Sequence, residues 1–496
     1  MSRIVVIGAG PGGLAAGARL AVKGHRVTVL EQAAQVGGKL RTRHRDGFAF
    51  DTGPSLFTLP AVYRDLFLKT GGALEDAVDL QELDPAFRLH FADGAEVLMP
   101  GVDPARCARA LGEGLGGNAE REWRTLMDRA SEMWRITREP FLQSPLTGWR
   151  NLLSLARSPR DVQTIAPFTT LRDLGRATFT DPRLVTLLDR YATYSGSDPR
   201  QAPAVLATIP YVEQTFGAWH LGGGLGTLAT ALADRCAARG VEVRTSTGVR
   251  RILTRDDRIA GVETADGEVI DADIVVANAD AGQVYGELLA GDARARKLAT
   301  SLERTSPSLA GFVILAAVDG HTAGVQHHNV WFPGHYDAEF DDIFGRHPQP
   351  VGDPTVYACV PDDPRMRPDG CESWFILINA PRHGDGTRGT VDWRAPGLAD
   401  RYADDVLRIL AERGTDIRPR IRWREVLTPA DYEAQVRAPG GSIYGTSSNG
   451  PRAAFQRPAN ASPIPGLYLV GGSAHPGGGL PLVGMSAEIV AGLIGR

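Results

Sequence analysis

Three glycines near the start of the chain have the spacing of a loop that binds the pyrophosphate of a dinucleotide. Gly8, Gly10 and Gly13 form a Gly-x-Gly-x-x-Gly pattern. In this pattern the first glycine permits a tight turn and the second lets the backbone approach the phosphates. The third lets a helix pack closely on a strand. The spacing therefore predicts a phosphate-binding turn.

Glu31 supplies the second element of a dinucleotide site. It lies 18 residues after Gly13, where a carboxylate can accept hydrogen bonds from ribose hydroxyl groups and would repel a 2′-phosphate. NADP is therefore disfavoured.

The elements around these residues fit that function. Residues 3–7 predict a buried parallel strand because four of them in a row, residues 4–7, are apolar. Residues 14–23 predict a helix that ends at Gly24, and residues 26–30 predict a second strand that ends at Glu31. A strand, a glycine turn and a helix in this order distinguish a nucleotide site from an ordinary glycine-rich turn.

A second glycine-rich stretch lies near the C-terminus. Residues 466–472 predict a strand that runs into a glycine turn, and three glycines at 477–479 precede a predicted helix from about residue 483. Backbone N–H groups at such a helix start can approach an electron-rich ring edge. This arrangement suits the ring of a reduced flavin.

The segment after Glu31 favours FAD over NAD. Gly37, Gly38 and Lys39, followed by residues 50–55, resemble the extended glycine fingerprint of the glutathione-reductase-type flavoproteins. The Lys39 ammonium group either faces the cofactor phosphates or is a solvated surface charge. The predicted cofactor site comprises Gly8, Gly10, Pro11, Gly12, Gly13, Glu31, Gly38, Lys39, Pro54, Ser55, Val249, Gly472, Gly479, Leu480, Pro481 and Leu482.

Composition excludes several other classes. The 496 residues carry a net charge of -4, and the isoelectric point near 6.3 gives no overall basic field for nucleic acid. The four cysteines form no CxxC pair, so we expect neither a zinc site nor a redox dithiol. We also expect no export signal and no membrane span, which implies a cytoplasmic protein with at most peripheral membrane contact.

The motifs predict an α/β protein, α+β overall, with a discontinuous Rossmann domain for FAD. We assign residues 1–70, 223–290 and 441–496 to the FAD-binding domain. Residues 71–110, 181–222 and 291–440 form the predicted mixed-sheet substrate domain, and residues 111–180 form a helical lobe.

The predicted lobe mixes large apolar residues with arginines between residues 134 and 174. Examples are Trp149, Leu152 and Arg150. Such a segment is typical of a helix on an anionic membrane surface, or alternatively of an amphipathic helix that covers a substrate tunnel.

Two patterns resemble other sites but fail on physical grounds. Adjacent side chains on an extended segment point to opposite faces, so His327 and His328 are not expected to hold one metal ion. Residues 37–40 lack the first glycine and the Ser/Thr of a phosphate-binding P-loop. We therefore predict no metal site.

Taken together, the motifs resemble the carotenoid and phytoene desaturase family of FAD-dependent oxidoreductases, almost from end to end. The resemblance rests on the two terminal glycine stretches and on residues 190–196, 327–329 and 336–344. It is closest to the hydroxycarotenoid 3,4-desaturases at residues 50–56, 195–199 and 479–483. Residues 361–364 and Leu482 depart from the family pattern, which affects the expected substrate more than the expected chemistry.

The resemblance implies hydride transfer from a carbon–carbon single bond of a long polyprenoid to flavin N5, with oxygen or a quinone as the final acceptor. Tyr191, Tyr194, Ser195, His327 and His475 are candidates for polar groups near the reacting carbons, and core packing is the alternative for each. A flavin amine oxidase, a retinoid-type saturase and a non-catalytic polyprenoid carrier remain alternative functions.

Overall fold

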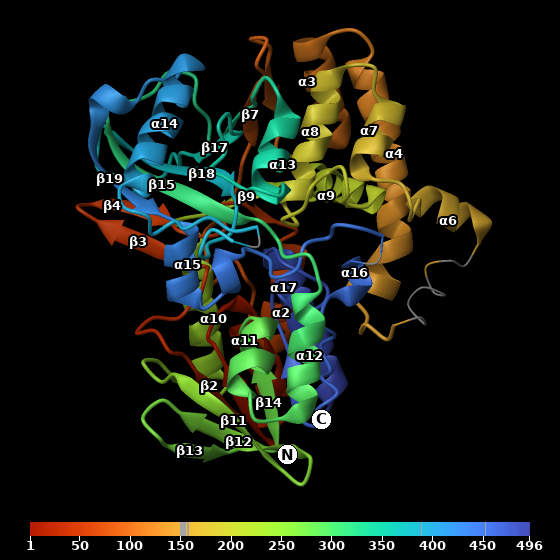
Figure 1. The fold of residues 1–496 in the computed structure, drawn as a ribbon, viewed down its shortest axis with the longest axis vertical. Helices are drawn as coiled ribbons and strands as arrows, with labels where there is room; N and C mark the ends of the chain where they lie inside the picture. Colours follow the sequence, from red (N-terminus) through yellow and green to blue (C-terminus); the bar gives the residue numbers. More distant parts are fainter. Residues whose placement is uncertain (149–154, 156–157, 388, 452) are drawn as a thin grey trace.

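The computed structural model describes residues 1–496 except 149–154, 156–157, 388 and 452 (Figure 1). The chain forms three parts that meet around one cavity. A nucleotide-binding part lies at the lower end of the view together with both termini, a large sheet lies at the upper left, and a helical lobe lies at the upper right.

A five-stranded parallel sheet forms the centre of the nucleotide-binding part. Its strands, in spatial order, are β10 (Glu242–Arg244), β2 (Arg26–Leu30), β1 (Arg3–Ile7), β14 (Ile274–Ala277) and β20 (Leu467–Leu469). The strands come from chain segments hundreds of residues apart. This part is therefore discontinuous in sequence.

Both faces of this sheet are covered, which explains the uninterrupted apolar run in β1. Ile4 and Val6 pack into one core with helices α1 (Pro11–Val22), α10 (Gly226–Ala238), α17 (Leu480–Ile494) and α2 (Ala61–Thr70). Val5 and Ile7 face the other core. That core is built with β11 (Val249–Arg255), β12 (Arg258–Thr264), β13 (Val269–Asp271), α11 (Ala281–Gln283), η3 (Val284–Leu288) and α12 (Ala293–Glu303).

A mixed seven-stranded sheet forms the second part. Its order is β19 (Ile421–Leu427), β15 (Ala310–Asp319), β18 (Cys371–Ala380), β17 (Val356–Cys359), β16 (His328–Trp331), β7 (Phe87–His90) and β8 (Glu96–Met99). Alternate residues of β18 face opposite sides. Ile376 and Ile378 pack against α14 (Leu398–Glu412), while Phe375, Leu377 and Asn379 line the cavity.

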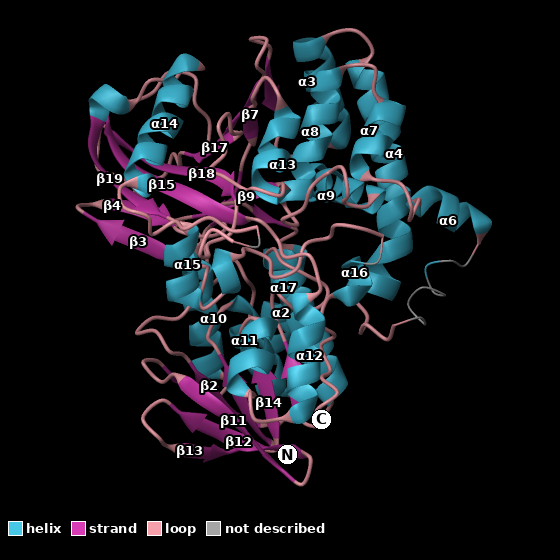
Figure 2. Cartoon of the chain, in the orientation of Figure 1, coloured by secondary structure: helices cyan, strands magenta, loops and turns pink. Residues whose placement is uncertain are grey.

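Helices dominate the third part (Figure 2). They are α3 (Pro104–Leu115), α4 (Ala119–Thr137), η1 (Arg138–Leu142), α6 (Pro159–Ile165), α7 (Leu171–Thr178), α8 (Pro182–Thr193), η2 (Ala204–Ala207) and α9 (Thr208–Phe216). Trp123, Leu126 and Leu188 belong to its core, which continues into β7 and β8.

Short elements connect the three parts. They are β3 (Thr42–Arg45), β4 (Phe48–Asp51), β5 (Phe57–Thr58), β6 (Leu80–Glu82), β9 (Ala218–Leu221), α13 (Tyr336–Phe344), α15 (Pro429–Val436), α16 (Ala453–Gln456), η4 (Arg418–Arg420) and η5 (Pro439–Gly441). Within the described part of the chain, no helix combines the length and the apolar character needed to cross a bilayer. All four cysteines are buried and free.

Candidate functional site

One cavity of about 830 Å³ extends through all three parts of the molecule. Its wall includes the end of β1 and the start of α1 on one side, apolar side chains of α4, α6 and α9 on another, and the inner face of β17 and β18 on the third. The predicted cofactor segments and an apolar channel therefore share one continuous space.

The phosphate-binding end of the cavity is a glycine cradle. Gly8 has φ +93°, and a Cβ atom there would lie 2.6 Å from the carbonyl oxygen of Asn278, so only glycine fits. Helix α1 begins after Gly10 without a side-chain cap, which leaves its first N–H groups open to an anion. Gly8, Gly10, Pro11 and Gly12 line the cavity, whereas Gly13 does not. A Cβ atom on Gly13 would collide with the carbonyl oxygen of Gly8, so Gly13 serves helix–strand packing.

Glu31 lies at the end of β2, in the position expected for a ribose ligand. Its Oε2 accepts from the N–H of Ala9 at 2.8 Å, and its Oε1 accepts from the N–H of Ala33 at 2.9 Å. These two bonds fix the carboxylate while leaving lone pairs on both oxygens. Val249, the first residue of β11, lines the same part of the cavity.

Lys39 lies against the cavity with its ammonium group donating to backbone oxygens. The acceptors are the carbonyls of Ser442 at 3.1 Å and Ile443 at 2.7 Å. Burial lowers the pKa of Lys39 to about 8, although the carboxylate of Asp280 raises it. Of the two roles predicted for Lys39, this position favours an ammonium group that faces an anionic ligand.

The C-terminal glycine stretch and the segments after Glu31 extend the cavity wall beside this cradle. Gly38, Pro54, Ser55, Gly472, Gly479, Leu480, Pro481 and Leu482 all line it, and α17 begins at Leu480. Arg457, which the sequence analysis missed, holds this region together because its Nη1 donates to the carbonyls of Tyr444 at 2.9 Å and Gly472 at 2.7 Å. No local motif marks Arg457.

This cradle fits an extended dinucleotide such as FAD. The chain keeps glycine where a side chain would fill the space, a carboxylate where ribose hydroxyls would lie, and a partly desolvated ammonium group nearby. Asn278 is a further missed residue: it stands at the crossing of the two glycine stretches, where its Nδ2 donates to the carbonyl of Val470 at 3.0 Å. The one sign of Asn278 in the sequence is that a polar residue follows the apolar run of β14.

The helical lobe contributes the apolar wall of the cavity. Trp134, Phe141, Leu142, Leu155 and Ile165 belong to the arginine-containing segment that the sequence singled out, and all five line the cavity. These positions match the substrate-tunnel alternative for that segment. Trp149, Arg150 and Leu152 lie outside the described residues.

Polar side chains interrupt this apolar wall at helix α8. Tyr194 and Ser195 line the cavity beside Arg190 and Glu213. Glu213 is buried, and its carboxylate accepts from the hydroxyl groups of Tyr191 at 2.6 Å and Tyr194 at 3.2 Å. Burial raises the pKa of Glu213, although Arg190 and the two tyrosines lower it.

Three of the predicted reacting residues lie outside the cavity wall. Tyr191 points to Glu213 from the core of the lobe. His475 is buried with its Nε2 donating to the carbonyls of Phe141 at 2.8 Å and Ser144 at 3.0 Å, so it ties the lobe to the C-terminal glycine loop. His327 lies next to His220 and is not part of the lining.

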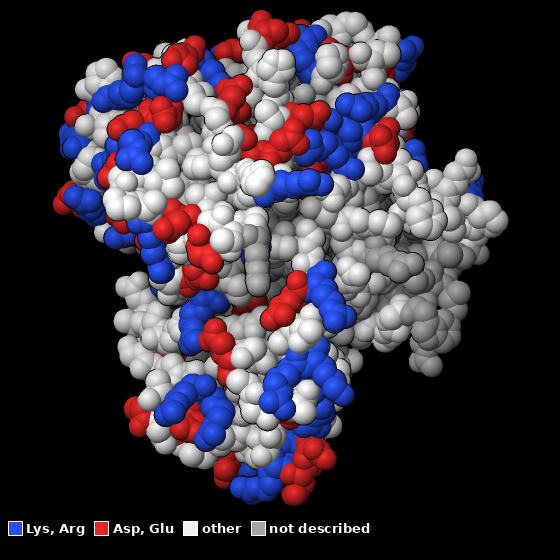
Figure 3. Space-filling model, viewed as in Figure 1, with Lys and Arg blue, Asp and Glu red and all other residues white. Residues whose placement is uncertain are grey.

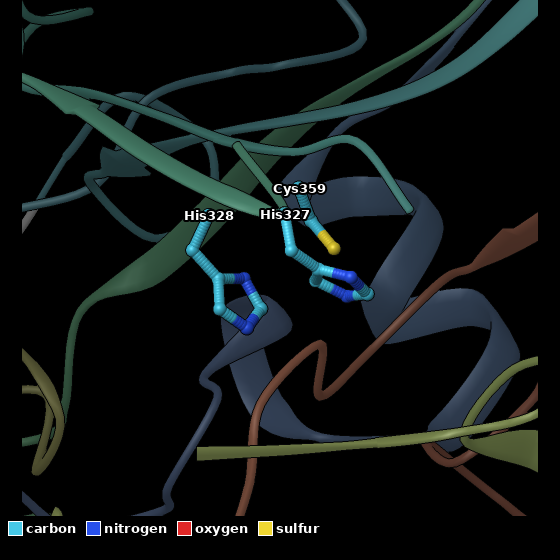
Figure 4. Close-up of side chains that lie close together, drawn as sticks. All are labelled: His327, His328 and Cys359. Atoms are coloured by element: carbon cyan, nitrogen blue, oxygen red, sulfur yellow. The ribbon is translucent and has the colours of Figure 1, made fainter. Parts of the chain in front are cut away.

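His327, His328 and Cys359 form a compact cluster behind the cavity wall (Figure 4). Their potential ligand atoms lie within 4.8 Å of one another. The expectation that the two imidazoles diverge is therefore wrong, because His327 precedes β16 and does not follow the alternation of the strand. Burial lowers the pKa of both histidines and raises that of Cys359, so all three are uncharged near neutrality. Of the described residues, these three could hold a metal ion, and binding would require loss of the thiol proton.

A hydrogen-bonded chain connects this cluster with the cavity. The Tyr357 hydroxyl bonds to Ser55 Oγ at 2.7 Å and to Nδ1 of His328 at 2.8 Å. Ser55 and Tyr357 line the cavity. The chain therefore links a predicted cofactor-binding residue to a buried imidazole.

Sequence comparisons place almost the whole chain in one family. Residues 11–494 match the model of the flavin containing amine oxidoreductases. The chain is 33% identical to the 4,4′-diapolycopene oxygenase of a Methylomonas species, over 98% of this chain and 97% of the relative. It is 34% identical to the hydroxyneurosporene desaturase of Rubrivivax gelatinosus (99% and 92%) and 32% identical to the 1-hydroxycarotenoid 3,4-desaturase of a Flavobacterium species (100% and 99%).

Solved structures share the fold at low sequence identity. An oxidoreductase from Methanosarcina mazei has a TM-score of 0.64 at 17% identity and covers 98% of each chain. Cyclohexylamine oxidase from Brevibacterium oxydans has a TM-score of 0.60 at 16% identity and covers 100% of each.

These matches confirm the fold class, the cofactor and the family resemblance predicted from the glycine motifs. The chain belongs to the flavin containing amine oxidoreductase family and is an FAD-dependent oxidoreductase.

Proposed function

We propose that this protein is a desaturase that uses FAD to oxidise a carbon–carbon single bond of a carotenoid or related long polyprenoid, and so extends a conjugated polyene. The continuous cavity carries this proposal, because it joins the nucleotide cradle to an apolar channel. The names of the carotenoid-modifying relatives agree with it.

The apolar residues of the lobe would hold the polyene chain. Trp134, Leu142, Ile165 and Met485 contribute to a wall that offers dispersion contacts and excludes water along its length. A wall of this kind selects for a long hydrocarbon and disfavours a small charged amine.

Bound FAD would supply the hydride acceptor, which no amino-acid side chain can provide. The chain itself must then accept a proton from the carbon next to the one that loses hydride. Glu213 is the candidate base, because its carboxylate faces the cavity and its raised pKa makes it a stronger proton acceptor than an ordinary glutamate. Tyr191 and Tyr194 position that carboxylate.

The test is anaerobic mixing of the purified, FAD-loaded protein with acyclic carotenoids. Loss of the oxidised-flavin absorbance together with a product two hydrogens lighter is the expected result. Flavin reduction by a panel of amines instead would establish an amine oxidase, and a product with fewer double bonds would establish a saturase. Binding of carotenoid with an unchanged flavin spectrum would establish a carrier.

We further propose that oxygen or a quinone reoxidises the flavin, and that the protein works in the cytoplasm at the membrane surface. The side chain of Phe168 is 88% exposed and that of Val162 is 38% exposed, at the end of the lobe where Val162 and Pro167 reach the cavity. Figure 3 shows few charged side chains over the described surface of α6 and α16. This face would admit a lipid-dissolved substrate.

A further inference from the structure

Two histidines and a cysteine bring their side chains together where two strands of the seven-stranded sheet pair. In the antiparallel pairing of β16 with β17, His328 lies directly opposite Cys359, and the N–H of Val360 donates to the carbonyl of His327 at 2.8 Å. Figure 4 shows both rings and the thiol projecting to the same side of these strands. Imidazole nitrogen and thiolate sulfur are the ligands that thiophilic metal ions prefer. We call His327, His328 and Cys359 the His–Cys cluster.

The imidazoles of the His–Cys cluster have nitrogen atoms that the protein leaves unused. The Tyr357 hydroxyl bonds to Nδ1 of His328 at 2.8 Å, but Nε2 of this fully buried ring has no hydrogen-bond partner among the described residues. The ring of His327 is half-buried and packs against those of His220 and His328, with 4.8 Å and 4.6 Å between ring centres. An unpaired buried nitrogen is costly, because its bond to water is lost on folding and not replaced. A ligand that takes up a nitrogen of this ring would offset that cost.

Neighbouring side chains orient the His–Cys cluster from two directions. On the cavity side, the Tyr357 hydroxyl that bonds to His328 also bonds to Oγ of Ser55 at 2.7 Å. On the other side, Nε2 of His220 bonds to the buried carboxylate of Asp363 at 3.0 Å, which fixes the ring that packs against His327. Metal-binding histidines are held by hydrogen-bonded partners of this kind. The cluster therefore has the outer contacts that keep metal ligands in position.

The charges beside the two histidines favour an ion of low charge. Asp363 is already paired with Arg365 at 3.0 Å, and the guanidinium group of Arg190 acts on His328. A buried site with little spare negative charge does not readily take a full dication. With Cys359 as a thiolate, a complex with Cu⁺ is neutral and one with Zn²⁺ carries a single positive charge. Mg²⁺ and Ca²⁺ prefer oxygen ligands, which the cluster does not offer.

We propose that the His–Cys cluster binds one thiophilic metal ion, Cu⁺ or Zn²⁺, through two imidazole nitrogens and one thiolate. On binding, the S–H bond of Cys359 breaks, a sulfur–metal bond forms, the proton passes to solvent and no electron is transferred. Bonds of about 2.0 Å to nitrogen and about 2.3 Å to sulfur place the ligand atoms roughly 3.5 Å apart, so the side chains close by about 1 Å. The bound ion ties β16 to β17. This inference does not depend on the proposed desaturase function.

The test is metal titration of the FAD-loaded holoprotein without oxygen. Zn²⁺ and Cu⁺, the latter kept reduced by ascorbate, each compete against a coloured chelator, and Mg²⁺ is the third arm. We expect one equivalent of Cu⁺ to bind with a dissociation constant below about 1 μM, Zn²⁺ to bind more weakly and Mg²⁺ not to bind. Loading should also raise the melting temperature, because the ion binds the folded chain. Tighter binding of Zn²⁺ than of Cu⁺ at the cluster supports the site and assigns it to zinc.

Variants assign the ion to the His–Cys cluster. Cys359→Ser and His327→Gln each remove one ligand and should raise the dissociation constant about 100-fold or more. Cys107→Ser is the matched control, because Cys107 is another buried free cysteine, in α3, and belongs to no metal-binding group among the described residues. It should leave metal binding unchanged. Flavin content and thermal melting verify that each variant is folded.

X-ray absorption of the loaded wild-type protein decides the ligands even if a variant fails to fold. We expect one sulfur and two imidazole nitrogens around the ion. A shell without sulfur overturns the proposal, as does wild-type binding no tighter than about 10 μM or equal affinity in Cys359→Ser and Cys107→Ser. Flavin bleaching by carotenoids is a separate measurement, and its result leaves this inference unchanged.

Discussion

Single residues decide whether this site can hold its cofactor and move a proton. The nucleotide cradle depends on glycines, which leave open the space that a side chain would fill. The chemistry depends on buried charges at Lys39, Arg190 and Glu213. Burial shifts the pKa of Lys39 down and that of Glu213 up. Both shifts bring the pKa of the group closer to neutral pH. A bound ligand or substrate can therefore change the protonation state of Lys39 or Glu213.

Replacing Gly10 tests the cradle. In Gly10→Val the new Cβ would lie 2.7 Å from Oδ1 of Asn278, and the branched side chain would occupy the phosphate position. The purified variant should therefore contain almost no flavin by absorbance. Gly17→Ala, in the same helix α1, meets its neighbours at an ordinary 3.4 Å and should retain flavin. A yellow Gly10→Val protein would contradict the assignment of the phosphate site.

Lys39 predicts a pH dependence of FAD binding. With its pKa lowered to about 8 in the free protein, the ammonium is charged below that pH and neutral above it. The dissociation constant for FAD should thus stay level up to about pH 8 and then rise, by at most about tenfold per pH unit. Flavin fluorescence titrations from pH 6.5 to 9.5 measure it.

Two variants separate the charge of Lys39 from its bulk. Lys39→Met should bind FAD weakly with no such rise, while Lys39→Arg should move the rise out of the measured range. The lowered pKa of Lys39 also affects the stability of the protein without FAD. Between pH 8 and the ordinary lysine pKa the unfolded chain binds more protons than the folded chain, so the free energy of unfolding increases with pH in that range. If the dissociation constant of Lys39→Met for FAD still rose above about pH 8, Lys39 would be excluded as the cause of the pH dependence.

Glu213 predicts a pH dependence of the chemical step. Glu213→Gln preserves an oxygen for the hydroxyls of Tyr191 and Tyr194 but cannot take a proton, so flavin reduction by substrate should slow by about 10²- to 10⁴-fold. Stopped-flow absorbance measures this rate. In the wild type the rate should fall as the pH drops through the raised pKa, above the ordinary glutamate range. A variant with an unchanged rate would assign the proton to another acceptor.

At the scale of secondary-structure elements, hydrogen bonds from single buried side chains hold separate segments in place. Asn460 is the clearest case, because the two N–H groups of its Nδ2 are shared among the carbonyls of Leu469 at 3.1 Å and His475 at 2.8 Å and Oγ of Ser486 at 3.0 Å. Strand β20, the glycine loop and helix α17 meet at this one amide. The C-terminal wall of the cofactor site therefore depends on it.

Asn460→Ala should lower the free energy of unfolding by about 2–3 kcal/mol, because it removes the buried amide donor from the carbonyl of Leu469 and leaves the space of the side chain empty. Chemical denaturation measures the loss, and the variant should also release FAD faster on gel filtration. Asn118→Ala is the control: Asn118 precedes α4, is exposed and makes no capping bond through its side chain, so its effect should stay within about 0.5 kcal/mol. Equal stability of the two variants would refute the role of Asn460.

At the scale of the whole molecule, the three parts enclose a site that none of them could form alone. The nucleotide part supplies the cradle, strand β18 of the sheet supplies Phe375, Leu377 and Asn379, and the lobe supplies most of the apolar wall. The lobe also carries Phe168, whose exposed ring is the contact with a bilayer that we propose.

Phe168→Glu should weaken binding to anionic lipid vesicles by roughly 10- to 100-fold, since it removes an exposed aromatic ring that would enter the bilayer and adds a repelled charge. Vesicle cosedimentation measures the partitioning. Val269→Glu replaces another exposed apolar side chain, 60% exposed at the opposite end of the molecule in β13, and should leave binding unchanged. Similar losses in both variants would contradict a membrane face at α6.

The amino-acid sequence by itself determined the cofactor segments, because local rules govern them. A continuous apolar run requires a strand covered on both faces, and glycines at fixed spacing after it permit one phosphate-binding turn. Strands β1, β2 and β20 follow from such rules, whereas helices α1 and α17 each begin three residues before the predicted position, at Pro11 and Leu480. The predicted domain boundaries stay a prediction.

Only the tertiary structure decided which side chains face the cavity. Asn278 and Arg457 lie 179 residues apart in the chain, and no periodicity of their own segments marks them. His475 turned toward the lobe and His327 toward His220 because buried carbonyls and rings offered partners there. The physical reason is that burial and hydrogen-bond satisfaction are settled between distant segments, whereas sequence patterns report only the conformation of neighbours along the chain.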